Sequence, residues 1–582
     1  MVFKSAVLTI IVAVAIGAAV SAMRANYEGV RAGRADADYV ESRKCIACHA
    51  DHYQSWARTY HSRMTQEARR GSVQGDFENN NTFEYQGVTA RMERRNNSFV
   101  MTFTYPDSRV ESNTIVRTVG SRRIEQYITE KNGQYSRLPV AYDLINHRWM
   151  NLIGSFFYPD GKDYSHLRSA WDPNCVFCHN VKAQPNFDFN TRLFNTEVAE
   201  LGIACGACHG AAAAHADRAG SPFTRTFWRL SGGAPRGITN PRKLDPERSL
   251  MVCGHCHGQR IPEPIDSIRE ILSHGDPYNA GGDLAAYYRP VWRETRIGEY
   301  SFANRFWANG SPRLTAYEYQ GILRSACFVK GDKQNRITCL SCHSMHDGDP
   351  KGQITADNRT NKPCLSCHGQ YKTEAKLAQH TGHRADSEGS RCYNCHMPRL
   401  VYGIMSIHPT HDITVPDPQL TFARLVPNAC NQCHLDRSVN WAVKQSKRLW
   451  PARFAEARES EDSQFDIAEG PRALFAGDAL TRALMAEALA GGGPFRLDAS
   501  WASPWLVEAL RDDYPIVRFF AAGGLPTMWK GTHKPDYLNP RECREAADRF
   551  GSLFDESVRQ KAAMLAETLR AKRPNVDIEV GE

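Results

Sequence analysis

The chain repeats the pattern Cys-x-x-Cys-His eight times, and no other feature of the sequence constrains its structure as strongly. Random order of 18 Cys and 21 His among 582 residues would give about 0.02 such motifs. The repeats are therefore not accidental. Numbered one to eight in chain order, the motifs are Cys45, Cys48, His49; Cys175, Cys178, His179; Cys205, Cys208, His209; Cys253, Cys256, His257; Cys339, Cys342, His343; Cys364, Cys367, His368; Cys392, Cys395, His396; and Cys430, Cys433, His434.

The spacing within each motif predicts covalent haem attachment. Two cysteines three positions apart lie on one side of a helical turn, so both sulfurs can form thioethers with one porphyrin, and the next histidine can bind its iron. Zinc ribbons and disulfides also use Cys-x-x-Cys pairs, but neither explains a histidine in the fifth position eight times. The sequence thus predicts eight haem c groups with iron. Cys327 and Cys543 lie outside the motifs and are expected to be small buried thiols, or a disulfide with each other.

The thirteen remaining histidines are enough to give every iron a second axial ligand. Their positions around the motifs favour five of them as distal ligands, namely His61, His215, His346, His383 and His411. The sequence does not decide about five others, which are His147, His166, His274, His380 and His408. If all irons are six-coordinate, the chain is an electron conduit. If one iron is five-coordinate, the chain is an enzyme.

The N-terminus contains one apolar run, Ala6 to Val20, which is followed by Ser21 and Ala22. This layout is typical of a secretory signal peptide over residues 1–22, and the alternative is an uncleaved membrane anchor. A run of about 15 apolar residues is shorter than the roughly 20 of a spanning helix, which favours cleavage. Either way, the body of the chain is expected in the periplasm or outside the cell.

The net charge of +8 does not indicate a nucleic-acid partner. It is the difference between 72 basic and 64 acidic residues, and the sequence contains no long basic block. Eight ferric haems, each with two propionates, would add roughly eight negative charges and nearly cancel the excess. Many of the arginines are therefore expected to pair with propionates.

The motif spacing indicates how the chain is organised. Motifs five to eight lie only about twenty to thirty residues apart, too close for an ordinary hydrophobic core, so stacked porphyrins are expected to supply the buried apolar surface. The predicted segments are a first haem segment over 41–70, a β-rich insert over 71–150, a multihaem core over 151–445 and a helical domain over 471–582.

Local patterns predict the structure of the two haem-free segments. Phe99, Met101 and Phe103 alternate with polar residues, which predicts an antiparallel meander with turns at 96–97, 106–107 and 132–133. Near the C-terminus, helical periodicity on both sides of 512–515 predicts an antiparallel helix pair. A last long helix is expected from Phe550 to Leu569, and the polar stretch 456–470 is expected to be a linker.

Several stretches of the sequence resemble a known family. They are CIACHADHYQSWARTYHSRM, GIACGACHGAAAAH, CLSCHSMH, CLSCHGQ, HTGHRADSEGSRCYNCHMP and NACNQCHLDRSVNWA, which together span most of residues 41–445. They are similar to bacterial multihaem c-type cytochromes related to the nitrifier tetrahaem cytochrome and the octahaem hydroxylamine oxidoreductases. The resemblance implies the same five distal histidines. Related octahaem nitrite reductases carry a lysine at the catalytic haem, whereas all eight motifs here end in histidine. The stretch LVEALRDDYPIVRFFAAGGL resembles a HEAT-type repeat.

These features predict a multihaem cytochrome c with mainly α and irregular structure around a stacked haem core, a small antiparallel β insert and a C-terminal HEAT-like helical region. The expected function is electron transfer through mostly bis-histidine haems, with other cytochromes or a membrane quinol-linked donor as partners. One alternative is an oxidoreductase of the hydroxylamine, nitrite or sulfur-oxyanion class with one five-coordinate haem. Another alternative is a subunit of a conductive filament.

Overall fold

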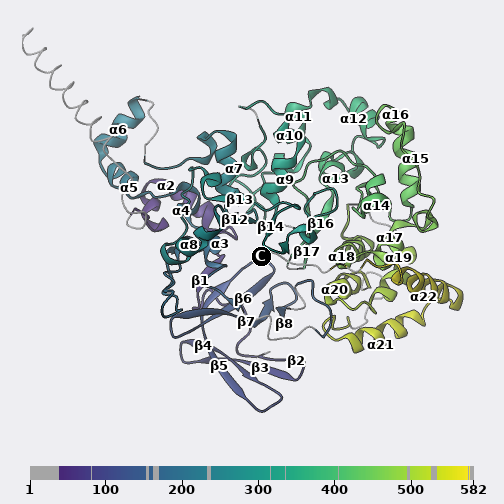
Figure 1. Cartoon of the computed structure of the whole chain (residues 1–582), viewed down its shortest axis with the longest axis horizontal. Coiled ribbons are helices and arrows are strands. Elements are labelled where there is room, and N and C mark those ends of the chain that lie inside the picture. The colour runs from purple at the N-terminus through teal and green to yellow at the C-terminus, as the bar shows by residue number, and fades with distance from the viewer. Residues whose placement is uncertain are drawn as a thin grey trace, which may run out of the picture.

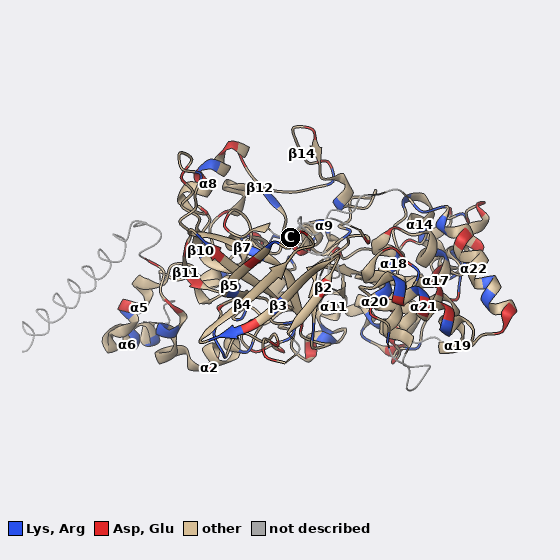
Figure 2. Cartoon of the chain, turned by 90° about the horizontal axis from the view of Figure 1, so that it is seen from below, with Lys and Arg blue, Asp and Glu red and all other residues tan. Residues whose placement is uncertain are grey.

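The computed structural model describes residues 38–574 and 576, apart from 80, 153–155, 162–168, 232–236, 315, 334–335, 404, 495–497 and 526–533. The expected signal peptide or anchor over 1–22 therefore lies outside the described residues, as does His166. Within the described part of the chain, no helix is both long and apolar enough to cross a membrane. Basic and acidic residues are interspersed along the described chain (Figure 2).

An antiparallel sheet of nine strands forms the lower part of the molecule in Figure 1. Its main path runs in sequence order from β2 to β8, while β1 pairs with β5 and β9 pairs with β7. The strands are β1 Thr65–Glu67, β2 Thr82–Tyr85, β3 Val88–Arg95, β4 Ser98–Thr104, β5 Val110–Val119, β6 Ile124–Lys131, β7 Gln134–Asp143, β8 Arg148–Asn151 and β9 Ser169–Ala170.

The alternating sequence pattern explains this sheet. Met92, Met101 and Phe103 are fully buried, and Met92 lies opposite Met101 in the register of β3 and β4. The tight turns fall at residues that tolerate a positive φ, with Asn96 at 55° and Asn132 at 54°. The predicted meander and its turns are therefore confirmed.

The motif-bearing part of the chain consists of short helices joined by irregular segments and small hairpins. Its α-helices are α2 Ile46–Ala57, α3 Val176–His179, α4 Cys205–His209, α5 Ala213–Gly220, α6 Pro222–Ser231, α7 Pro246–Gly254, α8 Ile268–His274, α9 Glu318–Arg324, α10 Ala326–Val329, α11 Lys362–Cys367, α12 Glu374–Thr381, α13 Cys392–His396, α14 Gln419–Arg424, α15 Val439–Leu449 and α16 Pro451–Phe454. Its hairpins pair β10 Asn180–Gln184 with β11 Glu197–Leu201, β12 Arg260–Pro262 with β13 Tyr288–Pro290, β14 Arg296–Ile297 with β15 Tyr300–Ser301 and β16 Arg399–Tyr402 with β17 Ser406–Pro409.

The C-terminal region is helical, and Figure 1 shows it packed beside β16, β17 and the sheet. Its α-helices are α17 Glu469–Ala476, α18 Ala479–Glu487, α19 Ala499–Ala509, α20 Pro515–Gly524, α21 Pro540–Gly551 and α22 Glu556–Arg570. Helices α19 and α20 form the helix pair predicted around 512–515. The expected single helix from Phe550 to Leu569 is wrong, because the chain leaves the helix at Ser552 and starts again at Glu556. The stretch 456–470, expected to be a linker, contains a short 3-10 helix over Ser463–Asp466, and the side chain of Phe465 is buried.

Hydrophobic burial is uneven along the chain. One large cluster joins sheet residues such as Met101 and Phe103 to helical residues such as Leu484 and Leu506. By contrast, the buried hydrophobic side chains among the described residues from 330 to 429 are only Leu377, Val401, Met405 and Ala429. This stretch contains motifs five to seven, so its side chains supply little core of their own.

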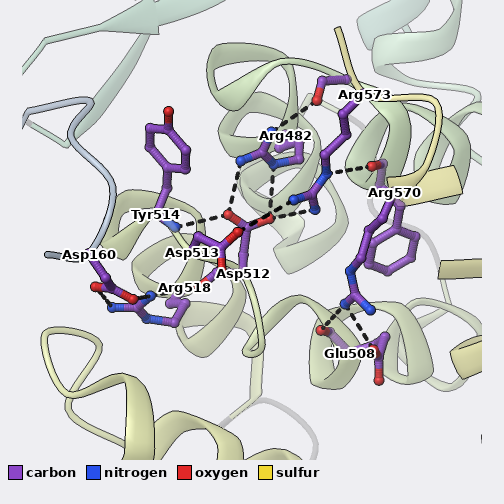
Figure 3. A network of polar contacts seen from close by, with 11 residues as sticks. Asp160, Arg482, Glu508, Asp512, Asp513, Tyr514, Arg518, Arg570 and Arg573 are labelled. Atoms are coloured by element: carbon purple, nitrogen blue, oxygen red, sulfur yellow. Dashed lines mark hydrogen bonds and ion pairs between the residues drawn. The ribbon is translucent and has the colours of Figure 1, made fainter. Parts of the chain in front are cut away.

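A buried network of ion pairs ties the helical region together (Figure 3). Asp512, only 3% exposed, accepts hydrogen bonds from Arg482 at 2.9 and 3.1 Å and from Arg573 at 2.9 Å. Arg518 is fully buried and binds Asp160, next to the sheet, at 2.7 and 2.9 Å. A buried charge is tolerated only while it is paired, so these contacts fix α18, α20 and the chain after α22 in one arrangement.

Replacing Asp512 by alanine is predicted to destabilise the helical region by about 3–5 kcal/mol, because two guanidinium groups would lose their shared carboxylate. Asp513→Ala is the matched control, since the Asp513 side chain is 77% exposed and lies 4.0 Å from Arg573. Urea unfolding of both variants, followed by far-UV circular dichroism, measures the difference. Equal midpoints for the two variants would contradict the role given to the buried network.

Candidate haem-binding sites

The cysteine motifs fold locally into single helical turns. In motif four, the backbone N–H of His257 donates to the carbonyl of Cys253 at 2.8 Å, which closes one turn. The same bond closes motifs two, five, six and eight, from His179 to Cys175 at 3.2 Å and from His343 to Cys339, His368 to Cys364 and His434 to Cys430 at 2.9 Å each. Such a turn places both sulfurs on one side, as two thioethers to one porphyrin require. Cys327 and Cys543, the two cysteines outside the motifs, are not joined to each other by a disulfide; Cys543 is buried and Cys327 is half-buried.

Six of the motif histidines face a second histidine across a nearly constant gap. The ring centroids are 6.4 Å apart for His49 and His215, 6.1 Å for His209 and His346, 6.1 Å for His257 and His61, 6.3 Å for His343 and His411, 6.2 Å for His396 and His380 and 6.0 Å for His434 and His383. These centroid distances are too long for direct ring stacking, and they match the distance expected when two imidazoles bind the same metal ion from opposite sides. In metal sites the metal–imidazole nitrogen bond is about 2.0–2.1 Å and the ring centroid lies roughly 1 Å further, which gives about 6 Å between opposite rings.

Backbone carbonyls orient several of these rings. The Nδ1 atom of His209 lies 2.7 Å from the carbonyl of Thr239, that of His343 lies 3.0 Å from Gly352, and that of His396 lies 2.8 Å from Thr414. Because a carbonyl can only accept, each Nδ1 carries the proton and each Nε2 keeps a lone pair. Such second contacts hold a metal-binding imidazole in the required tautomer and direction.

Burial favours the neutral form of two facing histidines, His61 and His411. It lowers the pKa of His61 to about 4, and it also lowers the pKa of His411. At neutral pH both rings are therefore uncharged and can offer a lone pair to a metal. His61 lies twelve residues after motif one, yet its ring faces His257 of motif four.

The structure also places the histidines that the sequence left open. His380 faces His396, and its other neighbour is the ring of Tyr371 at 4.2 Å. His274 is exposed and pairs with Glu270 at 3.0 Å, whereas His147 is exposed in a turn with φ 50°. His408 lies in β17 with its Nε2 2.8 Å from the hydroxyl of Ser406. The sequence signal for His380 is only its position in the stretch HTGH, one turn before His383.

Two motif histidines have other surroundings. The ring of His179 packs edge-on against Trp171 at 5.4 Å. His368 is exposed, and no ring contact with another histidine is found for it in the described part of the chain. His52 lies 5.9 Å from His49, but it sits three residues later in α2 and stacks on His346 at 4.4 Å, too close for a metal between the rings.

Cysteines of different motifs lie side by side. Hydrogen bonding to Cys205 raises the pKa of Cys45, which places motif one against motif three. Thiol–thiol contacts of the same kind join three more pairs of motifs. Cys178 of motif two contacts Cys256 of motif four, Cys253 of motif four contacts Cys339 of motif five, and Cys364 of motif six contacts Cys392 of motif seven. In three further cases, the charge of a cysteine in one motif raises the pKa of a thiol in another motif. Cys253 raises the pKa of Cys208, Cys364 that of Cys342, and Cys395 that of Cys430. The motifs thus follow the order one, three, four, five, six, seven, eight, with motif two beside four.

Two buried guanidinium groups next to the motifs have spare donors. The Nε atom of Arg260 and the Nη1 atom of Arg399 are buried without a hydrogen-bond partner. Arg260 influences the pKa of Cys178 and Cys256, and Arg399 influences that of Cys433. An unpaired donor beside a haem-attachment motif suits a propionate, so the residues present fit the group that the motifs imply.

Comparison with known proteins supports haem attachment. The family model described as "Doubled CXXCH motif" matches residues 329–373, which hold motifs five and six. The solved crystal structure of the outer cell wall cytochrome OcwA is similar at 14% sequence identity and a TM-score of 0.47, covering 92% of this chain and 100% of that chain. No curated protein matches. The motif match supports covalently bound haem c in this chain.

Replacing Cys364 and Cys367 by alanine is predicted to remove one haem per chain, because motif six would lose both thioether sulfurs. Cys327→Ala is the control, since this thiol lies outside every motif and should leave the haem content unchanged. Intact-protein mass spectrometry and a pyridine haemochrome assay count the haems. A wild-type count far below eight, or no loss in the double variant, would contradict the assignment.

Proposed function

We propose that this chain is an exported octahaem cytochrome that transfers electrons through a continuous series of haem c groups. The observation that carries the proposal is the set of six histidine pairs, each with its centroids 6.0–6.4 Å apart and each including a motif histidine. Haem c, when bound, supplies an iron that takes up and releases single electrons.

The residues of each pair determine what the site can do. The motif histidine and its facing histidine would both hold the iron, which would leave no coordination position for a substrate at such a site. The two cysteines of the motif would hold the porphyrin through thioethers. An axially filled site with fixed ligands changes little on gaining or losing an electron and suits transfer better than catalysis. The five distal ligands His61, His215, His346, His383 and His411 are proposed on this basis, and His380 is added as a sixth.

The side-by-side motifs favour a relay over isolated sites. Each motif from three to seven has a cysteine that contacts or electrostatically affects a cysteine of the next motif, which supports an unbroken series. Motif one at one end and motif eight at the other would then exchange electrons with separate partners. We propose other cytochromes or a membrane quinol-linked donor as these partners, in the periplasm or outside the cell, in keeping with the apolar N-terminal run.

His61→Ala is predicted to open one axial position and convert one haem from low spin to high spin in the oxidised protein. His274→Ala is the matched control, because this exposed histidine pairs only with Glu270 in the described structure and should not alter any haem. Electron paramagnetic resonance of the ferric proteins, with carbon monoxide binding to the reduced proteins, detects the change. An unchanged spectrum in His61→Ala would contradict the pairing.

The same spectra separate electron transfer from catalysis. A high-spin ferric signal in the wild-type protein that changes on adding nitrite or hydroxylamine would overturn the electron-transfer proposal in favour of an oxidoreductase. Concentration-dependent polymers under the electron microscope would instead favour a filament subunit.

A further inference from the structure

The helix α6, Pro222–Ser231, carries an exposed hydrophobic face. Phe223, Phe227 and Leu230 lie four and three residues apart, so they share one face, and their side chains are 85%, 51% and 82% exposed. Single exposed hydrophobic residues are ordinary on a protein surface, but three on one short helix form a patch. Figure 1 shows α5 and α6 at the edge of the molecule, away from the sheet and the C-terminal helices.

The other sides of α6 show how this face is oriented. Thr224 and Trp228 are half-buried, and the Trp228 ring stacks on that of His215 at 5.8 Å with an angle of 3° between the planes. Arg225 and Arg229 are exposed, and the helix contains no acidic residue. The helix therefore turns its tryptophan toward the protein and leaves its three apolar residues and two arginines exposed on its other sides.

The first described residue of the chain lies at the same place. The backbone N–H of Ala213, the first residue of α5, donates to the carbonyl of Asp38 at 2.9 Å, and Asp38 is the first described residue. The 37 preceding residues include the apolar run from Ala6 to Val20. The described chain thus begins at the edge of the molecule that carries the amphipathic helix.

We propose that the exposed face of α6 docks into the surface of an anionic phospholipid bilayer. Phe223, Phe227 and Leu230 would enter the boundary between headgroups and acyl chains, while Arg225 and Arg229 would meet lipid phosphates. Ten helical residues are about 15 Å long, half the roughly 30 Å of a bilayer core, so the helix lies in the plane of the surface instead of crossing it.

Docking at this edge places one end of the motif series near the membrane. Trp228 stacks on His215, and His215 faces His49 of motif one. Motif one would then be the site that exchanges electrons with a membrane donor. This consequence rests on the electron-transfer function proposed above, whereas the docking itself does not.

Hydrogen–deuterium exchange of the full haem-loaded chain tests the docking without depending on electron transfer. The expected result is exchange about tenfold slower in peptides covering 222–231 when phosphatidylglycerol-containing vesicles are added, and no such change with pure phosphatidylcholine vesicles. The variant with Phe223→Ser and Leu230→Ser should lose this protection. Leu553→Ser is the matched control, because Leu553 is 60% exposed in the turn between α21 and α22 and should leave the protection intact.

All three proteins keep the N-terminal segment, so any anchoring by that segment is the same in each. An unchanged haem spectrum and unchanged exchange elsewhere show that the double variant is folded. Unchanged exchange over 222–231 on adding anionic vesicles would overturn the proposal. Equal protection by neutral vesicles would overturn the choice of anionic lipid, and protection that grows with protein concentration without vesicles would assign this face to a second copy of the chain.

Discussion

The rest of the structure depends on pairs of imidazoles that approach one point from opposite sides. Local sequence supplies one member of each pair, because the histidine of a Cys-x-x-Cys-His turn is fixed next to its two cysteines. The second member often comes from a distant segment, as when His61 faces His257 and His346 faces His209. A shared iron would cross-link these segments, so binding haem and fixing the tertiary structure are one process in this part of the chain.

The distribution of buried side chains also indicates that haem contributes to the tertiary structure of one part of the chain. The sheet and the C-terminal helices share a large hydrophobic cluster and a network of buried ion pairs, and both can be stable through their own side chains. The described residues from 330 to 429 bury few hydrophobic side chains, although they contain three motifs. Porphyrin surface is the natural source of the missing apolar contact there. The chain thus combines a conventional scaffold with a segment whose core is largely its cofactor.

The features of the fold that depend on local interactions could be predicted from the sequence. The motif turns, the strand alternation around Met101 and the turn at Asn132 depend on neighbouring residues and could be predicted. The pairing of His61 with motif four could not, because nothing near His61 identifies a partner so far along the chain. The sequence does not decide about His380, and only the fold shows that both it and His383 face a motif histidine. The break between α21 and α22 was missed because apolar periodicity continues across it.

An experimental structure of the haem-loaded protein, by crystallography or cryo-electron microscopy, tests the histidine pairing most directly. We expect iron density midway between the rings of His61 and His257, with both Nε2 atoms bonded to the same iron, and the same arrangement at the other five pairs. A map in which His61 and His257 bind different irons, or in which a paired histidine points away from any iron, would contradict the pairing.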